Sequence, residues 1–151
     1  YEFELVVAIG KQGARITVEK SVEHVWCYGS GLDMTRRDVQ IASRDKGRPW
    51  DMGKGFDHSA PCTALWPVSK VGHVDAGKIE LKVNGQVKQS SDLKAMIWNT
   101  PETISYLSGL VELFPGDLIY TGTPEGVGPV VKGDKLEGEI AKLGKLSITI
   151  G

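Results

Sequence analysis

Three acidic residues have the types and the positions needed to bind a metal ion. Glu2 and Glu4 lie two residues apart at the start of an alternating apolar run, so on a strand they would project to one side, about 6.5–7 Å apart. Asp33 lies where a second predicted strand leads into a helix. A cation between such carboxylates relieves their repulsion, and oxygen ligands without a soft partner suit Mg²⁺ or Mn²⁺.

Each acid also has a simpler explanation. Glu2 and Glu4 would equally form the solvated face of a strand, because the apolar residues of the run occupy the alternate positions. Asp33 competes with nearby Thr35 as the residue that caps the following helix. From the residues alone, these explanations stay open beside the metal site.

Cationic and polar residues follow the acids. Arg36 and Arg37 each lie about one turn before Gln40 on the helix predicted after the third acid. An arginine there either neutralises the acids or holds a substrate carboxylate by two hydrogen bonds. Lys54 lies between glycines that allow close approach of the backbone to a ligand, although an isolated lysine is commonly a surface residue. The glycine-rich segment 121–128 matches no phosphate-binding loop, but its hydroxyls and amides suit an anionic ligand.

Composition excludes several classes of protein. Lys and Arg number 18 against 19 Asp and Glu, so no broad basic surface is available for nucleic acid or anionic lipid. No apolar run approaches the roughly 20 residues of a membrane span. Cys27 and Cys62 form neither a CxxC pair nor a His/Cys cluster, which favours reduced thiols in the cytoplasm. Motifs for covalent nucleophilic catalysis are missing.

The elements that must position these residues are mainly strands. Strands are expected at 2–9, 26–32, 118–121, 135–140 and 145–150, with a hairpin over 78–89 and short helices at 22–25, 36–45 and 100–114. Asn84-Gly85 is the signal for a type I′ hairpin turn. Strands dominate without a βαβ alternation, which predicts a β-rich α+β fold. At 151 residues the chain has the length of one compact domain.

Six segments, in order over nearly the whole chain, resemble the fumarylacetoacetate hydrolase family. They are YEFELVVAIG, GLDMTRRDVQ, GRPWDMGKGFDHSAP, KVNGQVKQ, MIWNTPETISYLS and PGDLIYTGTPEGVGPV. Within the family, the second and third segments are most similar to the bacterial fumarylpyruvate hydrolases of gentisate degradation. The resemblance implies the fold of the family's C-terminal domain, a mixed-sheet β-sandwich or roll with short helices.

The resemblance also assigns roles to individual residues. The ligands that it implies for one Mg²⁺ or Mn²⁺ ion are Glu2, Glu4 and Asp33. The residues that it places at the substrate are Arg37, Gln40, Lys54 and Thr123, of which Lys54 and Arg37 are expected to be catalytic.

The implied reaction is metal-dependent hydrolysis of a C–C bond in a 2,4-diketo acid, here fumarylpyruvate to fumarate and pyruvate. Acylpyruvases, oxaloacetate decarboxylases and hydroxyheptadienedioate isomerases share most of the six segments and are the alternatives. The resemblance further implies a homodimer. Residues 1–151 are expected to form a single catalytic domain. The resemblance implies an N-terminal lid helix with a His and a Glu as the source of the general base, but nothing in the sequence matches it. The chain also opens at Tyr1 inside a strand pattern, so this lid segment is expected to be missing.

A hypothesis from another class is a non-enzymatic, β-rich binding module. In such a module the acids would bind Ca²⁺ structurally or simply face solvent. Ca²⁺ takes six to eight oxygens, often from one loop of the DxDxDG type, and the sequence contains no such loop.

Overall fold

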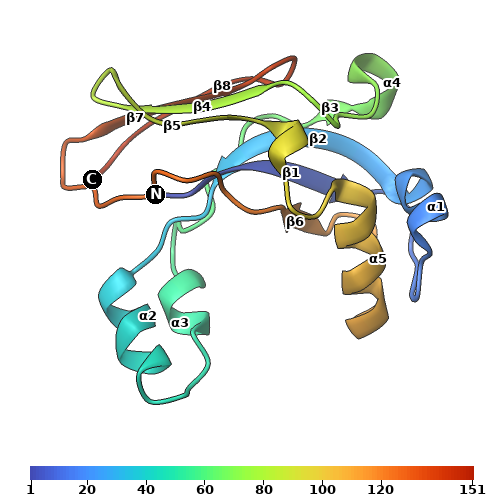
Figure 1. Ribbon diagram of the computed structural model, residues 1–151, viewed down its shortest axis with the longest axis horizontal. Coiled ribbons are helices and arrows are strands. Elements are labelled where there is room, and N and C mark those ends of the chain that lie inside the picture. The colour runs from blue at the N-terminus through green and yellow to red at the C-terminus, as the bar shows by residue number, and fades with distance from the viewer.

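Two four-stranded sheets pack against each other, with short helices at their margins, in the computed structural model of residues 1–151 (Figure 1). The strands are β1 (Phe3–Ile9), β2 (Val25–Leu32), β3 (Trp66–Pro67), β4 (Lys78–Val83), β5 (Gln86–Asp92), β6 (Leu118–Tyr120), β7 (Lys135–Ile140) and β8 (Gly144–Thr149). The helices are α1 (Val18–Ser21), α2 (Arg37–Arg44), α3 (Asp51–Lys54), α4 (Val68–Val71) and α5 (Thr100–Leu110), with 3-10 turns η1 (Val22–His24) and η2 (Leu93–Ala95).

The first sheet has the order β3-β2-β1-β6 and the second β5-β4-β7-β8. Every pair of neighbouring strands in both sheets is antiparallel, whereas the family resemblance implied a mixed sheet. The predicted β-rich α+β class is confirmed. None of the helices is long and apolar enough to cross a membrane.

β1 is the central strand of the first sheet, and all seven of its residues are buried. It pairs with β2 along its whole length, and with β6 at Val6–Ala8. The alternating pattern had suggested one exposed face. Both faces are covered, since even Val6 and Ala8 on the second face are at most 1% exposed.

The core lies between the inner faces of the two sheets. Phe3 of β1 points at β7, where Gly138 leaves room for its ring: a Cβ at this position would overlap the ring. Leu81 of β4 and Leu136 and Ile140 of β7 complete the contact, and all are fully buried. The aromatic ring beside the acids is therefore held by the second sheet.

The β4–β5 hairpin forms as predicted. Asn84 and Gly85 both have positive φ, 51° and 78°, as a type I′ turn requires. The helix predicted over 100–114 begins at Thr100, but its capping box is formed by Asn99 and Glu102 and it ends at Leu110. After Leu110 the backbone adopts an extended conformation, because Leu113 pairs with Gly13 in an isolated β-bridge.

The two helices expected near the N-terminal strands differ in detail. The helix predicted after Ser21 lies earlier, at Val18–Ser21, and a 3-10 turn occupies Val22–His24. Ser21 donates its hydroxyl to the Thr17 carbonyl and caps nothing. Thr35, the other candidate for the cap of the helix after Asp33, does not cap it, since no side chain caps the first turn of α2.

The contact between Phe3 and Gly138 predicts the effect of a single methyl group. Gly138→Ala overpacks the core and should lower the free energy of unfolding by about 1–3 kcal/mol in urea titrations. Gly109→Ala is the matched control. Gly109 lies in α5 with open space around the added carbon, so this substitution should raise the free energy of unfolding by about 0.5–1 kcal/mol. A neutral Gly138→Ala would contradict the packing described.

Candidate metal centre

The register of β1 and β2 brings the three acids onto one face of the first sheet. Phe3 is paired with Leu32, and the Asp33 amide donates to the Glu2 carbonyl at 2.8 Å, so Asp33 lies opposite Glu2. Glu4 lies two residues further along the same face. One carboxylate oxygen from each of the three lies within 4.8 Å of the others. Residues 31 positions apart in the sequence thus form one acidic cluster.

Glu4 is the buried member of the cluster. Its side chain is almost inaccessible, with the residue 3% exposed, and its Oε2 accepts a hydrogen bond of 2.8 Å from the Gly122 amide. No ion pair reaches it. Burial, together with the charges of Asp33 and Glu2, raises the pKa of Glu4 to about 7. The explanation of Glu4 as part of a solvated strand face is therefore wrong.

Lys54 and Arg37 neutralise the two outer acids. The Lys54 ammonium lies 2.8 Å from Glu2 Oε2 and 2.8 Å from Asp33 Oδ2, and the Arg37 guanidinium lies 2.8 Å from Glu2 Oε1. Burial alone would raise the pKa of Glu2, but hydrogen bonds from Lys54 and Arg37 outweigh it and hold this pKa below its ordinary value. Burial would lower the pKa of Lys54, and its two carboxylate partners raise it.

These cations come from an arm formed by α2 and α3, which project side by side from the first sheet (Figure 1). Gly53 packs on the backbone of Gln40, where a Cβ would lie only 3.1 Å from the Gln40 nitrogen. The Arg36 amide donates to the Gly53 carbonyl at 2.9 Å. This close packing of the two helices carries Lys54 back to the acids. The segment 47–61, for which no helix was predicted, therefore contains the short helix α3.

Thr35 and Gln40, from the segment after Asp33, lie beside the same cluster. Arg36 does not, since its guanidinium lies 4.3 Å from the centre of the Phe56 ring. Gln40 accepts a hydrogen bond of 2.7 Å from Arg37, so its amide is next to the guanidinium that contacts Glu2. Asp33 makes no capping bond to α2, and Thr35 instead lies 3.5 Å from Glu2 Oε1. The explanation of Asp33 as a helix cap is wrong.

Thr123 lies beside the acids, but its hydroxyl is already engaged. It donates to the Phe3 carbonyl at 3.0 Å and accepts from the Gln89 amide at 2.8 Å. The backbone N–H of Thr123 makes no hydrogen bond within the chain. A carboxylate at this position would therefore be bound by the amide rather than by the hydroxyl.

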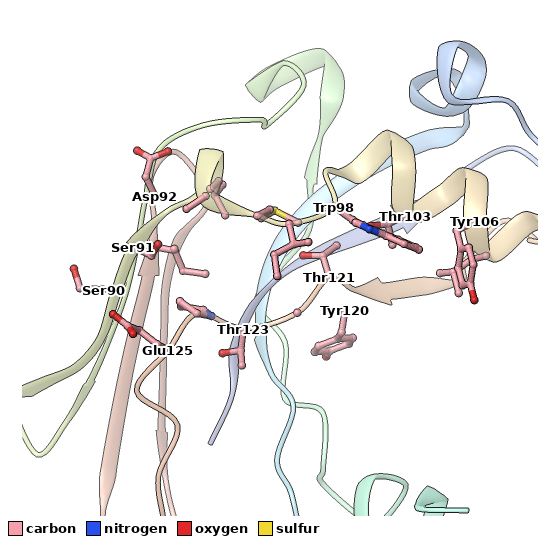
Figure 2. Close-up of a pocket in the computed structure, with 18 residues that line it drawn as sticks. Ser90, Ser91, Asp92, Trp98, Thr103, Tyr106, Tyr120, Thr121, Thr123 and Glu125 are labelled. Carbon is pink, nitrogen blue, oxygen red and sulfur yellow. The ribbon is translucent and has the colours of Figure 1, made fainter.

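A pocket of about 750 Å³ adjoins the cluster and shares Gly122 and Thr123 with it. Figure 2 shows Ser90, Ser91 and Asp92 along one side of this pocket, with Trp98, Thr103 and Tyr106 across from them. Half of the residues that line it are hydrophobic. Its only charged lining residues are Asp92 and Glu125, so it contains no cation.

Two residues at the site were missed by sequence reasoning. Gly122 binds Glu4 through its backbone amide, for which no side chain gives a signal. Gln89 holds the 121–124 segment against β1. No signal in the sequence marked Gln89, because a regular Asn84-Gly85 hairpin would pair Leu81 with Lys88. A register shift between Leu81 and Lys82 brings Gln89 opposite Leu81 instead, and an amide among core residues needs specific partners.

The acidic cluster fits a hard dication. Glu4 is a buried carboxylate with only a backbone amide as partner, and such a charge is costly unless a cation neutralises it. Three carboxylates supply oxygen donors and leave positions for water and substrate. Glu2, Glu4 and Asp33 are therefore the residues that would hold Mg²⁺ or Mn²⁺.

Comparison with known proteins identifies the family of the chain. The model of the fumarylacetoacetate (FAA) hydrolase C-terminal family matches residues 1–151. The chain belongs to the fumarylacetoacetate hydrolase family. A fumarylpyruvate hydrolase of Ralstonia sp. is 52% identical over 151 residues, which are 100% of this chain and 78% of that protein. A mitochondrial oxaloacetate tautomerase of Mus musculus is 42% identical over 140 residues, 93% of this chain and 63% of the relative.

A solved structure of the same family has nearly the same fold. Fumarylpyruvate hydrolase from Pseudomonas aeruginosa, in complex with Mn²⁺ and pyruvate, superposes with a TM-score of 0.98 at 54% identity. The match covers 99% of this chain and 64% of that one. The chain thus spans 63% to 78% of the length of these three relatives. The predicted family and its C-terminal domain fold are confirmed.

The buried charge of Glu4 predicts how stability depends on pH and metal. With a pKa raised from 4.5 to about 7, Glu4 contributes stability that is complete below pH 4.5 and is lost as the pH rises through 7. In metal-free protein at pH 8, Glu4→Gln should therefore raise the melting temperature. Mn²⁺ should raise the melting temperature of the wild type and not that of Glu4→Gln, because the neutral amide is a poor ligand.

Glu23→Gln is the control for this pair of thermal-shift measurements, since Glu23 is an exposed acid paired with Lys11. It should leave the response to Mn²⁺ unchanged. An equal Mn²⁺ response in Glu4→Gln would mean that Glu4 is not a ligand.

Proposed function

We propose that the protein hydrolyses a C–C bond of a 2,4-diketo acid in a metal-dependent reaction, converting fumarylpyruvate to fumarate and pyruvate. The observation that carries this proposal is the cluster of Glu2, Glu4 and Asp33 beside Lys54. Support also comes from two fumarylpyruvate hydrolases at 52% and 54% identity, one of them in complex with Mn²⁺ and pyruvate.

In the proposed reaction, water adds to the 4-keto carbon and the C3–C4 bond breaks, releasing fumarate and the enolate of pyruvate, which takes up a proton at C3. The bound dication supplies Lewis-acid stabilisation of the enolate oxygen, worth several kcal/mol. Glu2, Glu4 and Asp33 hold the cation. Arg37 and Lys54 orient the substrate and add positive charge, and the free Thr123 amide binds the carboxylate next to the 2-oxo group.

Other assignments accompany this function. Gln40 orients Arg37 toward the substrate, since its amide already accepts from that guanidinium. Residues 1–151 act as one catalytic domain, and the free thiols of Cys27 and Cys62 favour a cytoplasmic location.

A second candidate is hydrolysis of acylpyruvates whose acyl chain is uncharged, and the pocket beside Thr123 favours it. Its lining is half hydrophobic and its charges are the acids Asp92 and Glu125, so it suits an uncharged acyl chain better than a fumaryl carboxylate. The cations that a fumaryl carboxylate needs, Arg37 and Lys54, come from the α2–α3 arm and do not line this pocket, and Arg37 is half exposed. Decarboxylation of oxaloacetate and isomerisation of a heptadienedioate use the same enolate chemistry and are further outcomes of the test.

A substrate panel on the full-length protein decides among these reactions. We expect Mn²⁺-dependent turnover that is highest on fumarylpyruvate, lower on acetylpyruvate, and abolished by a chelator. Glu2→Gln combined with Glu4→Gln should lower kcat/KM at least about 100-fold. Preference for acetylpyruvate would favour the second candidate, and turnover only of oxaloacetate or the heptadienedioate would overturn the hydrolase assignment.

Arg37 gives the panel a matched pair of variants. Arg37→Met should lower kcat/KM for fumarylpyruvate about 10–100-fold, and less for acetylpyruvate, which lacks the second carboxylate. Arg44→Met is the control, because Arg44 lies on the same helix and is paired with exposed Asp45. Equal losses on both substrates would assign Arg37 to the shared pyruvyl end.

We also propose that the protein is a homodimer that covers the apolar surface around α5. Large apolar side chains are exposed there, including Ile97 at 96% and Leu110 at 67%, with Trp98, Val111 and Phe114 nearby in the sequence. Covering such a patch is favourable by about 25 cal/mol per Å². Light scattering should give a dimer mass for the wild type and a monomer for Leu110→Lys. A monomeric wild type would refute the proposal.

A further inference from the structure

Gln89 is a buried amide in the middle of β5, with only 1% of its surface exposed. All of its polar atoms are engaged across the two sheets. Its Oε1 accepts from the Phe3 amide at 3.1 Å, and its Nε2 donates to Thr123 Oγ1 and to the Pro124 carbonyl, both at 2.8 Å. An amide is costly in a core unless it is fully bonded, so these contacts are the reason for a glutamine there.

The partners of Gln89 converge on the residue between the two glutamates. Phe3 donates its amide to Gln89 and accepts the Thr123 hydroxyl at its carbonyl, at 3.0 Å. The two peptide units that join Glu2 to Glu4 through Phe3 are therefore held from outside β1, one by Gln89 of the second sheet and the other by Thr123 of the segment after β6. The segment that contains Thr123 also contacts an acid directly, because the adjacent Gly122 donates its amide to the Glu4 carboxylate.

The pairing of β6 with β1 explains why the backbone of Phe3 needs side chains as hydrogen-bond partners. β6 pairs with β1 only at Val6–Ala8, so no strand continues along that edge of β1 at Phe3. Backbone groups in this buried region must still be bonded. Gln89 and Thr123 take the place of the missing strand at the point where the acids project.

We propose that Gln89 is a positioning residue of the metal centre, which fixes the spacing of Glu2 and Glu4 through Phe3 and holds Gly122 on Glu4 through Thr123. The inference rests on the proposed function only for the metal itself. Groups that orient metal ligands commonly change metal affinity about 10–100-fold when they are removed. Gln89 touches neither carboxylate, so its effect is exerted through the backbone.

The test measures Mn²⁺ binding to the full-length protein by electron paramagnetic resonance, without substrate. Gln89→Met keeps the length of the side chain and removes its hydrogen bonds. We expect its dissociation constant for Mn²⁺ to rise about 10–100-fold. Ser108→Ala is the matched control, since Ser108 is also a buried polar residue that bridges distant segments, from the Ile16 amide to the Ser105 carbonyl. It should lower the melting temperature and leave Mn²⁺ affinity unchanged.

A double-mutant cycle tests the route through the 121–124 segment. Thr123→Val should also weaken Mn²⁺ binding, and Thr123→Ser should restore it. The Mn²⁺ dissociation constant of the double variant Gln89→Met, Thr123→Val should exceed that of the weaker-binding single variant by no more than about twofold. Additive losses would overturn the shared route. If Gln89→Met does not fold, Gln89→Glu replaces it, because its carboxylate still accepts from the Phe3 amide but donates to neither Thr123 nor Pro124.

A folded Gln89→Met that binds Mn²⁺ within twofold of the wild type overturns the inference. Failure of the proposed reaction has a different signature. A wild type that binds Mn²⁺ and turns over no diketo acid would refute the reaction, whereas the comparison of dissociation constants would still support or refute Gln89. A wild type without affinity for Mn²⁺ would refute both.

Discussion

Repulsion among three carboxylates, held within 4.8 Å of one another on one sheet face, is the interaction on which the site depends. Glu2 and Asp33 are neutralised by Lys54, but Glu4 is buried with a single backbone amide as its partner. A folded chain keeps such an arrangement only if its backbone is held rigidly from outside the cluster. The second sheet and the segment after β6 supply that support.

The two sheets have different parts in this arrangement. The first sheet sets the register that places Asp33 opposite Glu2, and its central strand is covered on both faces. The second sheet supplies Gln89 and makes room for the Phe3 ring at Gly138. The arm of α2 and α3 adds the cations from outside. Metal ligands, charge compensation and support therefore come from three separate parts of the chain, which explains why the six family segments are spread over its length.

Much of the fold could be predicted because its signals are local. The β4–β5 hairpin formed as predicted because Asn84 and Gly85 adopt positive φ readily, and α5 begins at the predicted residue. Where prediction failed, a distant contact decided. The bridge between Leu113 and Gly13 ends α5 early. α3 forms where no helix was predicted, because Gly53 packs on α2.

By itself, the sequence determined the residue types of the site and two of its spacings: Glu2 and Glu4 on one side of a strand, and Arg37 beside Gln40 on a helix. Both follow from the short periods of strands and helices. Only the tertiary structure decided that Glu4 is buried and that the Thr123 hydroxyl is bonded to Phe3. Burial and partners of this kind are set by segments that are far apart in the chain, and no local period encodes them.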